Sequence, residues 1–342
     1  MKSRIIALGL IAVLLTGCSG AGEISETVEE YSGTYAFVTK SEGNAYNERM
    51  AQGFQEVIES SGGNCLIYNP EEATAEAQIE ILQDLLMQGM DSITVAANDE
   101  DALSSVLTDA MEQGICISTV DSDVSADVRQ VFVNQASAEE IARTLIEAVY
   151  DITGGSGQWA ILSASSQATN QNAWIRAMRS VMEEERYQDL RLVDIVYGND
   201  ETEASKEKTE ELLENYPDLK VICAPTTMGL AAAAEVLAER EETDVKATGL
   251  GLPSSMSAYV RGEEAVCPYF YLWNPVDLGR MSACVSLALK EGTITGAAGE
   301  TFETGDMGTI EIQENEYGGT EVIAASLTRF DAENIEEWET YF

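Results

Sequence analysis

Polar and aromatic side chains follow the short apolar runs of this 342-residue sequence, at the points where the runs end. The runs alternate with amphipathic stretches of helical spacing, which predicts parallel strands joined by helices. In open parallel sheets, ligands bind beyond the carboxyl ends of the strands. The candidate binding residues at these ends are Lys40, Asn44, Tyr46, Asn98, Asp121, Asn170, Gln171, Trp174, Pro225, Thr227, Trp273 and Asn274.

The residue types in this set favour a neutral, polyhydroxylated ligand. Amide and carboxylate side chains offer acceptors and donors to adjacent hydroxyl groups. An indole or phenol ring packs against the C–H face of a sugar ring, as it does against other amphipathic surfaces. A buried hydroxyl group without a partner costs about 1–3 kcal/mol, so such a site can reject a ligand that lacks one group.

Structural roles compete with ligand contact at several of these positions, and the sequence leaves both open. Asp121 could cap the turn after its strand, and Asn170 could be a helix N-cap, a role that Asn fills well. The other candidates with a competing role, as solvated loop, core or helix-entry residues, are Lys40, Trp174, Trp273 and Asn274.

Enzyme chemistry has little support in these residues. The sequence has no histidine, the usual general base near neutral pH and the commonest transition-metal ligand. It also lacks the phosphate-binding and nucleophile motifs G-x-G-x-x-G, G-x-x-x-x-G-K-[ST] and G-x-S-x-G. A glycosidase needs two facing carboxylates, whereas the strand ends supply Asp121 and Asp99 from the first half and no obvious partner from the second. We therefore expect a binding protein that is not an enzyme and has no cofactor or metal.

The composition is strongly acidic and limits the possible partners. There are 60 acidic and 19 basic residues, which gives a formal net charge of −41. A surface this negative repels phosphate backbones and anionic lipid headgroups, so nucleic acid is not an expected partner. Among the six cysteines, Cys116 and Cys223 lie inside apolar runs and are expected to be small core residues.

The first residues have the pattern of an export signal. A short basic start precedes an apolar stretch from Ile5 to Leu15, which is too short to span a bilayer comfortably. It ends in Leu-Thr-Gly-Cys18, which resembles the lipobox of bacterial lipoproteins; the alternative is a plain secretory signal. Residues 1–18 are thus interpreted as a lipoprotein signal peptide with Cys18 as the lipidation site, and residues 19–32 as a flexible tether. The protein is expected outside the cytoplasmic membrane, attached only through its lipid anchor.

The chain after Gly33 divides into two successive α/β halves. Helices are expected near 45–61, 74–88 and 101–113, between the first four apolar runs. The pattern restarts at the run RQVFVNQ and continues with helices near 138–152, 171–185, 203–215, 228–240 and 275–291. This order predicts two parallel sheets with right-handed crossover connections.

Several stretches resemble the sugar-binding proteins of bacterial rhamnose ABC transporters, whose relatives bind autoinducer-2. They are FVTK-x3-N-x-Y near the start, TAEAQIEILQDLLMQGMDSITVAANDEDAL, TVDSD, ILSASSQATNQNAW, CAPTTMGLAAAAEVL and YLWNPVDLG. The similarity runs from about Gly33 to the end of the chain.

The resemblance implies a type I periplasmic-binding-protein fold, in which two doubly wound parallel-sheet lobes are joined by three hinge crossings and hold the ligand between them. The implied N-terminal lobe is 33–121 plus 275–305, and the C-terminal lobe is 122–274 plus 306–342. It further implies polar ligand contacts by Lys40 and Asp121 from the first lobe and hinge, and by Asn170 and Gln171 from the second. Pro225, Thr227 and Asn274 match the remaining loop and crossing positions.

Differences from each branch of the family bear on the ligand. The autoinducer-2 branch has Asp-Gln where this chain has Asn170-Gln171, and alanine in place of Thr227, which favours the rhamnose branch. Rhamnose binders usually show Pro-Phe-Phe where this chain has Ala45-Tyr46-Asn47, so the choice of sugar stays open.

We therefore expect a monomeric solute-binding lipoprotein that captures L-rhamnose and delivers it to an ABC permease and its ATPase. The alternatives are an autoinducer-2 or pentose receptor of the same fold, or a sugar-sensing partner of a membrane receptor.

Overall fold

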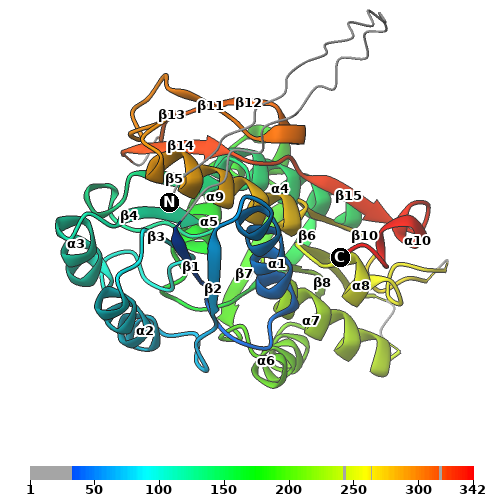
Figure 1. The fold of residues 1–342 in the computed structure, drawn as a ribbon. Coiled ribbons are helices and arrows are strands. Elements are labelled where there is room, and N and C mark those ends of the chain that lie inside the picture. The colour runs from blue at the N-terminus through cyan, green and yellow to red at the C-terminus, as the bar shows by residue number, and fades with distance from the viewer. Residues whose placement is uncertain (1–32, 242–243, 263, 316–317) are drawn as a thin grey trace, which may run out of the picture.

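The computed structural model describes residues 33–241, 244–262, 264–315 and 318–342. The predicted signal peptide, the lipidation site Cys18 and the tether lie outside the described residues. The described chain forms two α/β lobes that lie side by side (Figure 1). Within these ranges, no helix is both long enough and apolar enough to cross a bilayer.

The first lobe is built on a seven-stranded sheet in the order β13-β14-β5-β4-β3-β1-β2. All neighbouring strands pair in parallel except β13 and β14, which pair antiparallel. The strands are β1 (Thr34–Val38), β2 (Asn64–Tyr68), β3 (Ser92–Val95), β4 (Cys116–Val120), β5 (Val131–Asn134), β13 (Gln313–Glu314) and β14 (Thr320–Ile323). The helices associated with this lobe are α1 (Ala45–Ser60), α2 (Ala75–Gln88), α3 (Ser104–Glu112) and α9 (Pro275–Lys290).

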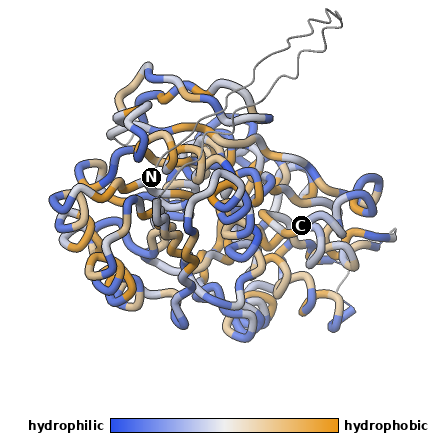
Figure 2. The backbone as a smooth tube through the Cα atoms, viewed as in Figure 1, coloured by the Kyte–Doolittle hydropathy of each residue, from blue (hydrophilic) through white to orange (hydrophobic). Residues whose placement is uncertain are grey.

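Both faces of this sheet are buried, as expected for parallel strands covered by helices. Successive side chains of a strand point to opposite faces. Tyr35 and Phe37 accordingly join the core cluster that continues into the second lobe, whereas Ala36 and Val38 join a separate cluster with residues of α2 and α3. Figure 2 shows apolar segments along the inner strands and hydrophilic segments mainly on outer helices and loops.

Helices α1 and α9 pack with their backbones in contact, because each has glycine at the crossing point. A Cβ atom added to Gly53 would lie 2.0 Å from the Val276 carbonyl oxygen, and one added to Gly279 would lie 1.9 Å from the Met50 carbonyl oxygen. This close packing fixes the start of α9, and with it Trp273, relative to the helix that carries Tyr46.

The second lobe has a four-stranded parallel sheet in the order β7-β6-β8-β9. Its strands are β6 (Gly157–Ser163), β7 (Leu190–Tyr197), β8 (Leu219–Ala224) and β9 (Lys246–Gly249). A bridge between Leu250 and Tyr271 continues the pairing to β10 (Tyr269–Leu272), which pairs antiparallel with β15 (Thr328–Asp331). The helices of this lobe are α4 (Ala138–Thr153), α5 (Thr169–Val181), α6 (Thr202–Asn215), α7 (Thr227–Glu239), α8 (Pro253–Met256) and α10 (Ile335–Trp338).

Outside the two main sheets, β11 (Thr301–Glu303) and β12 (Thr309–Glu311) form a small hairpin, at the top of Figure 1. The α/β fold with parallel sheets expected from the sequence is confirmed. The late strands β11 to β15, by contrast, have no counterpart among the elements expected from the sequence.

The chain passes between the lobes three times, at 135–137, 273–274 and 324–327. Two of the expected lobe boundaries, at 121/122 and 305/306, are therefore wrong. The run RQVFVNQ, interpreted as the start of the second half, contains β5, which pairs with β4 in the first sheet, and β14 pairs with β5. An apolar run has the same local pattern in either sheet, so its lobe is decided by long-range pairing that the local sequence does not encode.

The five described cysteines are all free thiols. Cys223 is fully buried, as expected, and burial raises the pKa of its thiol to about 12. Cys116 is only partly buried.

Candidate ligand-binding site

A cavity between the two lobes brings together most of the candidate residues. It has about 390 Å³ of empty space, including its opening to solvent, and is called the inner cavity below. Ten of the predicted site residues line it: Lys40, Asn44, Tyr46, Asp121, Asn170, Gln171, Trp174, Pro225, Thr227 and Trp273. The carboxyl ends of strands from both sheets thus meet at one space, as the sequence predicts.

The first lobe contributes a charged pair to the inner cavity. Lys40 follows β1, and its Nζ lies 3.1 Å from Oδ2 of Asp121, which follows β4. The two side chains are only 12% and 7% exposed, so this ion pair is largely removed from solvent. Lys40 also donates from Nζ to the Asn170 side-chain oxygen of the second lobe, at 3.4 Å.

The Asp121 carboxylate contacts side chains of both lobes. Its Oδ1 accepts a hydrogen bond from the Tyr46 hydroxyl at 2.9 Å, and its Oδ2 accepts one from the Asn170 amide at 3.1 Å. The backbone of Asp121 is left-handed, with φ of 62°, a conformation that costs most residues free energy but that Asp tolerates. A buried carboxylate in such a backbone, touching both lobes, is typical of a functional position.

Tyr46 links this carboxylate to the aromatic wall. Its hydroxyl accepts a hydrogen bond from Trp273 Nε1 at 2.7 Å while it donates to Asp121. Burial, and then the negative charge of Asp121, raise the pKa of Tyr46 well above its usual value. Tyr46 therefore stays protonated and acts as a donor at physiological pH.

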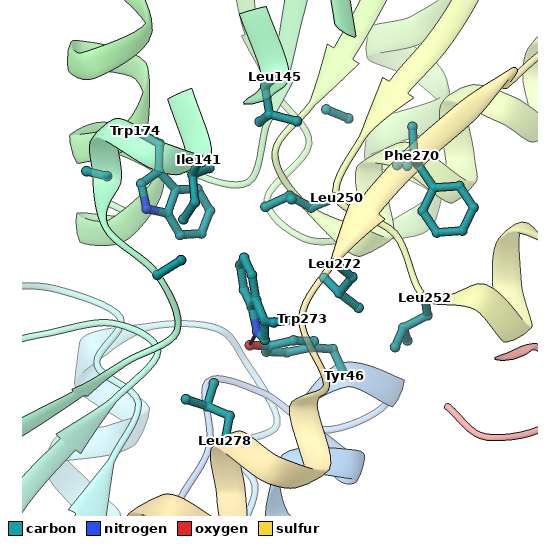
Figure 3. Close-up of a cluster of buried hydrophobic side chains, with 14 of the residues drawn as sticks. Tyr46, Ile141, Leu145, Trp174, Leu250, Leu252, Phe270, Leu272, Trp273 and Leu278 are labelled. Carbon is teal, nitrogen blue, oxygen red and sulfur yellow. Dashed lines mark hydrogen bonds between the residues drawn. The ribbon is translucent and has the colours of Figure 1, made fainter. Parts of the chain in front are cut away.

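Three aromatic side chains from different elements form one wall of the inner cavity (Figure 3). The Trp273 ring lies edge-on to Trp174, with ring centroids 6.0 Å apart, and to Tyr46, with centroids 6.3 Å apart. These rings come from α5, α1 and the second crossing, so both lobes supply the apolar surface. Leu250 and Leu272 extend the wall.

The second lobe presents amide groups from the first turn of α5. Gln171 Oε1 accepts from the Ser163 hydroxyl at 2.6 Å and from the Ala164 backbone N–H at 2.8 Å. With its oxygen engaged, Gln171 can offer a ligand its NH₂ group. Asn170 is not the N-cap of α5, because that position is Ala168, so the alternative capping role does not apply.

Two predicted site residues lie outside the inner cavity. Asn98 lines an outer cleft, formed among others by Thr74, Ser165 and Asn199, and its amide donates to the Lys40 carbonyl oxygen at 2.9 Å. Asn274 is the N-cap of α9, where its Oδ1 accepts from the Val276 N–H at 2.9 Å. Asn98 thus supports the Lys40 loop and Asn274 supports a helix.

The inner cavity also has lining residues that the site prediction did not include: Asn47, Asp200, Thr226, Leu250 and Leu272. Asp200 is the most consequential, because it follows β7 and so belongs to the second lobe. The expectation that no carboxylate faces Asp121 from the second half is therefore wrong. The sequence does contain a signal for Asp200, because Asn199-Asp200 directly follows the apolar run LRLVDIVYG. The predicted site includes no residue from the end of this run.

Asp200 is held by Thr226, which follows β8, the strand that β6 separates from β7. The Thr226 hydroxyl donates to Asp200 Oδ1 at 2.5 Å. Burial raises the pKa of Asp200, opposed by the Thr226 hydrogen bond and the Lys40 charge, while the Asp121 charge adds to the increase. In the described ranges, no group of three or more Cys, Asp or Glu side chains is arranged to hold a metal ion.

Comparison with known proteins agrees with this architecture. The family described as "Periplasmic binding protein domain" matches residues 35–294. A D-ribose/D-allose-binding protein of Pseudomonas aeruginosa is 26% identical over 254 residues, which cover 70% of this chain and 78% of that protein. The chain therefore belongs to the periplasmic binding protein family, whose members bind substrates and are not enzymes.

Solved structures extend the comparison. An ABC transporter solute-binding protein from Clostridium phytofermentas with bound L-rhamnose is 47% identical, with a TM-score of 0.89, and the match covers 91% of this chain and 99% of that one. A sugar ABC transporter protein from Actinomyces odontolyticus is 35% identical, with a TM-score of 0.71 and coverage of 90% and 97%. LsrB from Clostridium saccharobutylicum in complex with AI-2 shares the fold at 22% identity, with a TM-score of 0.84 and coverage of 89% and 99%. The resemblance to rhamnose-transporter binding proteins and the type I fold are both confirmed.

Proposed function

We propose that this protein captures a small neutral sugar, L-rhamnose in the first instance, and delivers it to an ABC importer. The observation that carries the proposal is the inner cavity, where Lys40 and Asp121 of one lobe meet Asn170 and Gln171 of the other beside an aromatic wall. The set offers hydroxyl groups both acceptors and donors. It also offers a nonpolar surface to ring C–H groups and to the methyl group of a 6-deoxyhexose.

Capture depends on contacts that bridge the lobes. In the structure, Asp121 and Asn170 are bonded to each other across the cavity, as are Lys40 and Asn170. A bound sugar would insert its hydroxyl groups among these side chains and replace each direct bond by a pair of bonds to the ligand. Because one ligand then contacts both lobes, its binding free energy favours the closed arrangement over the open one.

The 47% identity with the L-rhamnose-bound protein from Clostridium phytofermentas supports the choice of sugar. The remaining parts of the proposal come from the sequence: lipidation at Cys18, attachment to the outer side of the cytoplasmic membrane, a monomeric state, and transfer of the sugar to a permease driven by its ATPase.

Isothermal titration calorimetry against a panel of neutral sugars and autoinducer-2 tests the proposal. We expect L-rhamnose to bind with a stoichiometry of one, and we expect the sugar to be recovered unchanged after prolonged incubation. A product detected by chromatography would contradict a purely binding role. Preferential binding of autoinducer-2 or of a pentose would redirect the assignment to those ligands.

Lipidation at Cys18 has a separate test. Metabolic labelling with a fatty-acid analogue in a bacterial host should label the native chain, and Cys18→Ser should abolish the label and release the protein from the membrane fraction. Membrane retention of an unlabelled Cys18→Ser chain would contradict the anchor.

A further inference from the structure

Asp200 lies on the second-lobe side of the inner cavity, and its backbone is adapted to place it there. Asn199 and Asp200 have φ angles of 54° and 56°, two successive left-handed residues between β7 and α6. Backbone hydrogen bonds hold the segment to the end of β6, from Gly198 N to Ser163 O at 2.9 Å and from Asn199 N to Ala164 O at 2.7 Å. Asn and Asp tolerate this conformation better than other non-glycine residues.

The Asp200 carboxylate keeps acceptor capacity for a ligand. Its Oδ1 accepts a hydrogen bond from Thr226, and this is the only hydrogen bond to its side chain from residues that the structure describes. An ionised carboxylate has about four acceptor positions. Because Asp200 lines the inner cavity, a ligand in that cavity can supply the missing donors.

Asp200 also sets the charge of the inner cavity. Of the described side chains that line it, Lys40, Asp121 and Asp200 are the charged ones. Lys40 is paired directly with Asp121, which leaves one surplus negative charge when Asp200 is ionised. A carboxylate removed from water needs hydrogen-bond donors, and a second anion beside it raises its free energy further.

We propose that Asp200 is a specificity-determining residue, whose carboxylate accepts a hydrogen bond from one hydroxyl group of the captured sugar. The surplus charge excludes sugars that carry a carboxylate or phosphate group. A sugar without the matching hydroxyl group leaves Asp200 buried with too few donors and therefore binds more weakly. This inference rests on the proposed function, because it concerns the same cavity and the same class of ligand.

The test is a cycle of protein and ligand changes measured by calorimetry. The ligands are L-rhamnose, or whichever neutral sugar the panel identifies, and the analogues that each lack one ring hydroxyl group. The proteins are the native chain and Asp200→Gly, since glycine adopts the left-handed backbone without strain. We expect the variant to bind the parent sugar at least about tenfold more weakly. One analogue should bind the native chain about tenfold more weakly than the parent, and this difference should shrink to less than about threefold in Asp200→Gly.

Asn199→Gly is the matched control. It introduces glycine at the adjacent left-handed residue and leaves the carboxylate in place, so its affinity for the parent sugar should stay within about threefold of the native value. An equal loss in Asn199→Gly would assign the effect to backbone freedom and overturn the inference. Retention of every analogue difference in Asp200→Gly would overturn it as well.

A sugar that carries a carboxylate group tests the second claim of the proposal, that the surplus negative charge excludes anionic sugars. D-Galacturonate should not bind the native protein at concentrations that saturate it with the parent sugar, and tight binding would contradict the charge argument. Failure of the proposed function has a different signature. If the native chain binds no neutral sugar, both proposals fail; if it binds one but the analogue pattern ignores residue 200, only the role of Asp200 fails.

Discussion

The inner cavity has a first wall, made by residues of the first lobe, and a second wall, made by residues of the second lobe. These two walls are built in different ways. On the first-lobe side, the contacts join residues far apart in sequence: Tyr46 to Asp121 over 75 positions, and Trp273 to Tyr46 over 227. On the second-lobe side, Gln171 is positioned by Ser163 and Ala164, only eight and seven residues away. The first wall depends on the whole tertiary structure, whereas much of the second depends on one strand–turn–helix unit. Changes to the first wall should therefore affect binding most.

The largest expected effect is at Asp121. Asp121→Asn keeps a residue that tolerates a left-handed backbone but removes the charge that balances Lys40 and accepts from Tyr46 and Asn170. Loss of charge-assisted hydrogen bonds worth about 1.5–3 kcal/mol should weaken sugar binding on the order of a hundredfold in calorimetry. Native-like affinity would remove Asp121 from the site.

Asn170→Ala tests the second wall and should weaken binding about tenfold, because one neutral amide is lost. The melting temperature of the ligand-free protein should change little, since Asn170 is not the N-cap of α5. An affinity loss larger than that of Asp121→Asn would reverse the ranking of the two walls.

Tyr46→Phe removes one hydroxyl group from the Trp273–Tyr46–Asp121 chain and leaves the ring in the aromatic wall. We expect about fivefold weaker binding and a loss of about 1–3 kcal/mol in unfolding free energy, because Trp273 Nε1 and Asp121 each lose a buried partner. Calorimetry and chemical denaturation measure the two effects. A change in stability alone would make Tyr46 a structural residue.

Asp200→Asn should change how the stability of the ligand-free protein depends on pH. The pKa of Asp200 is raised in the folded protein by burial, so the stability gained from holding its proton is present at low pH. That stability is lost as the pH rises through the folded pKa. Asn at this position does not ionise, so the variant does not lose stability in this way. The melting temperature of the ligand-free variant minus that of the ligand-free native chain should therefore be larger at pH 7 than at pH 4. An equal difference at both pH values would contradict the pKa direction.

The smallest effect on affinity is expected for Asn274→Ala. This change removes the N-cap of α9, which should cost about 0.5–2 kcal/mol of stability, yet Asn274 does not line the inner cavity. Calorimetry should give an affinity within about twofold of the native value. A tenfold loss would show that α9 transmits its position to the site through Trp273.

The sequence was informative wherever function follows from the end of a strand. Lys40, Asp121 and Gln171 could be selected because parallel strands present their carboxyl ends to one edge of a sheet. The same rule applies to Asp200, which follows β7, although the predicted site includes no residue from that strand end. The predicted positions Asn98 and Asn274 proved to be a loop support and a helix cap. A polar residue near a strand end has the same local pattern in each of these roles.

The lobe boundaries could not be read from the sequence for a different reason. The order of strands within a sheet depends on pairing between distant segments, such as β5 with β14, which are separated by nearly the whole second lobe. Local periodicity identifies a strand but does not specify its neighbours.

The aromatic wall has a practical consequence for study of this protein. Trp273 lies at the crossing between β10 and α9, and Trp174 belongs to the second lobe, so movement of the lobes changes the surroundings of both indoles. Intrinsic fluorescence can therefore report occupancy and closure without a label, and Trp174→Phe and Trp273→Phe would assign the signal to each ring. The chain thus contains its own optical sensor of ligand capture.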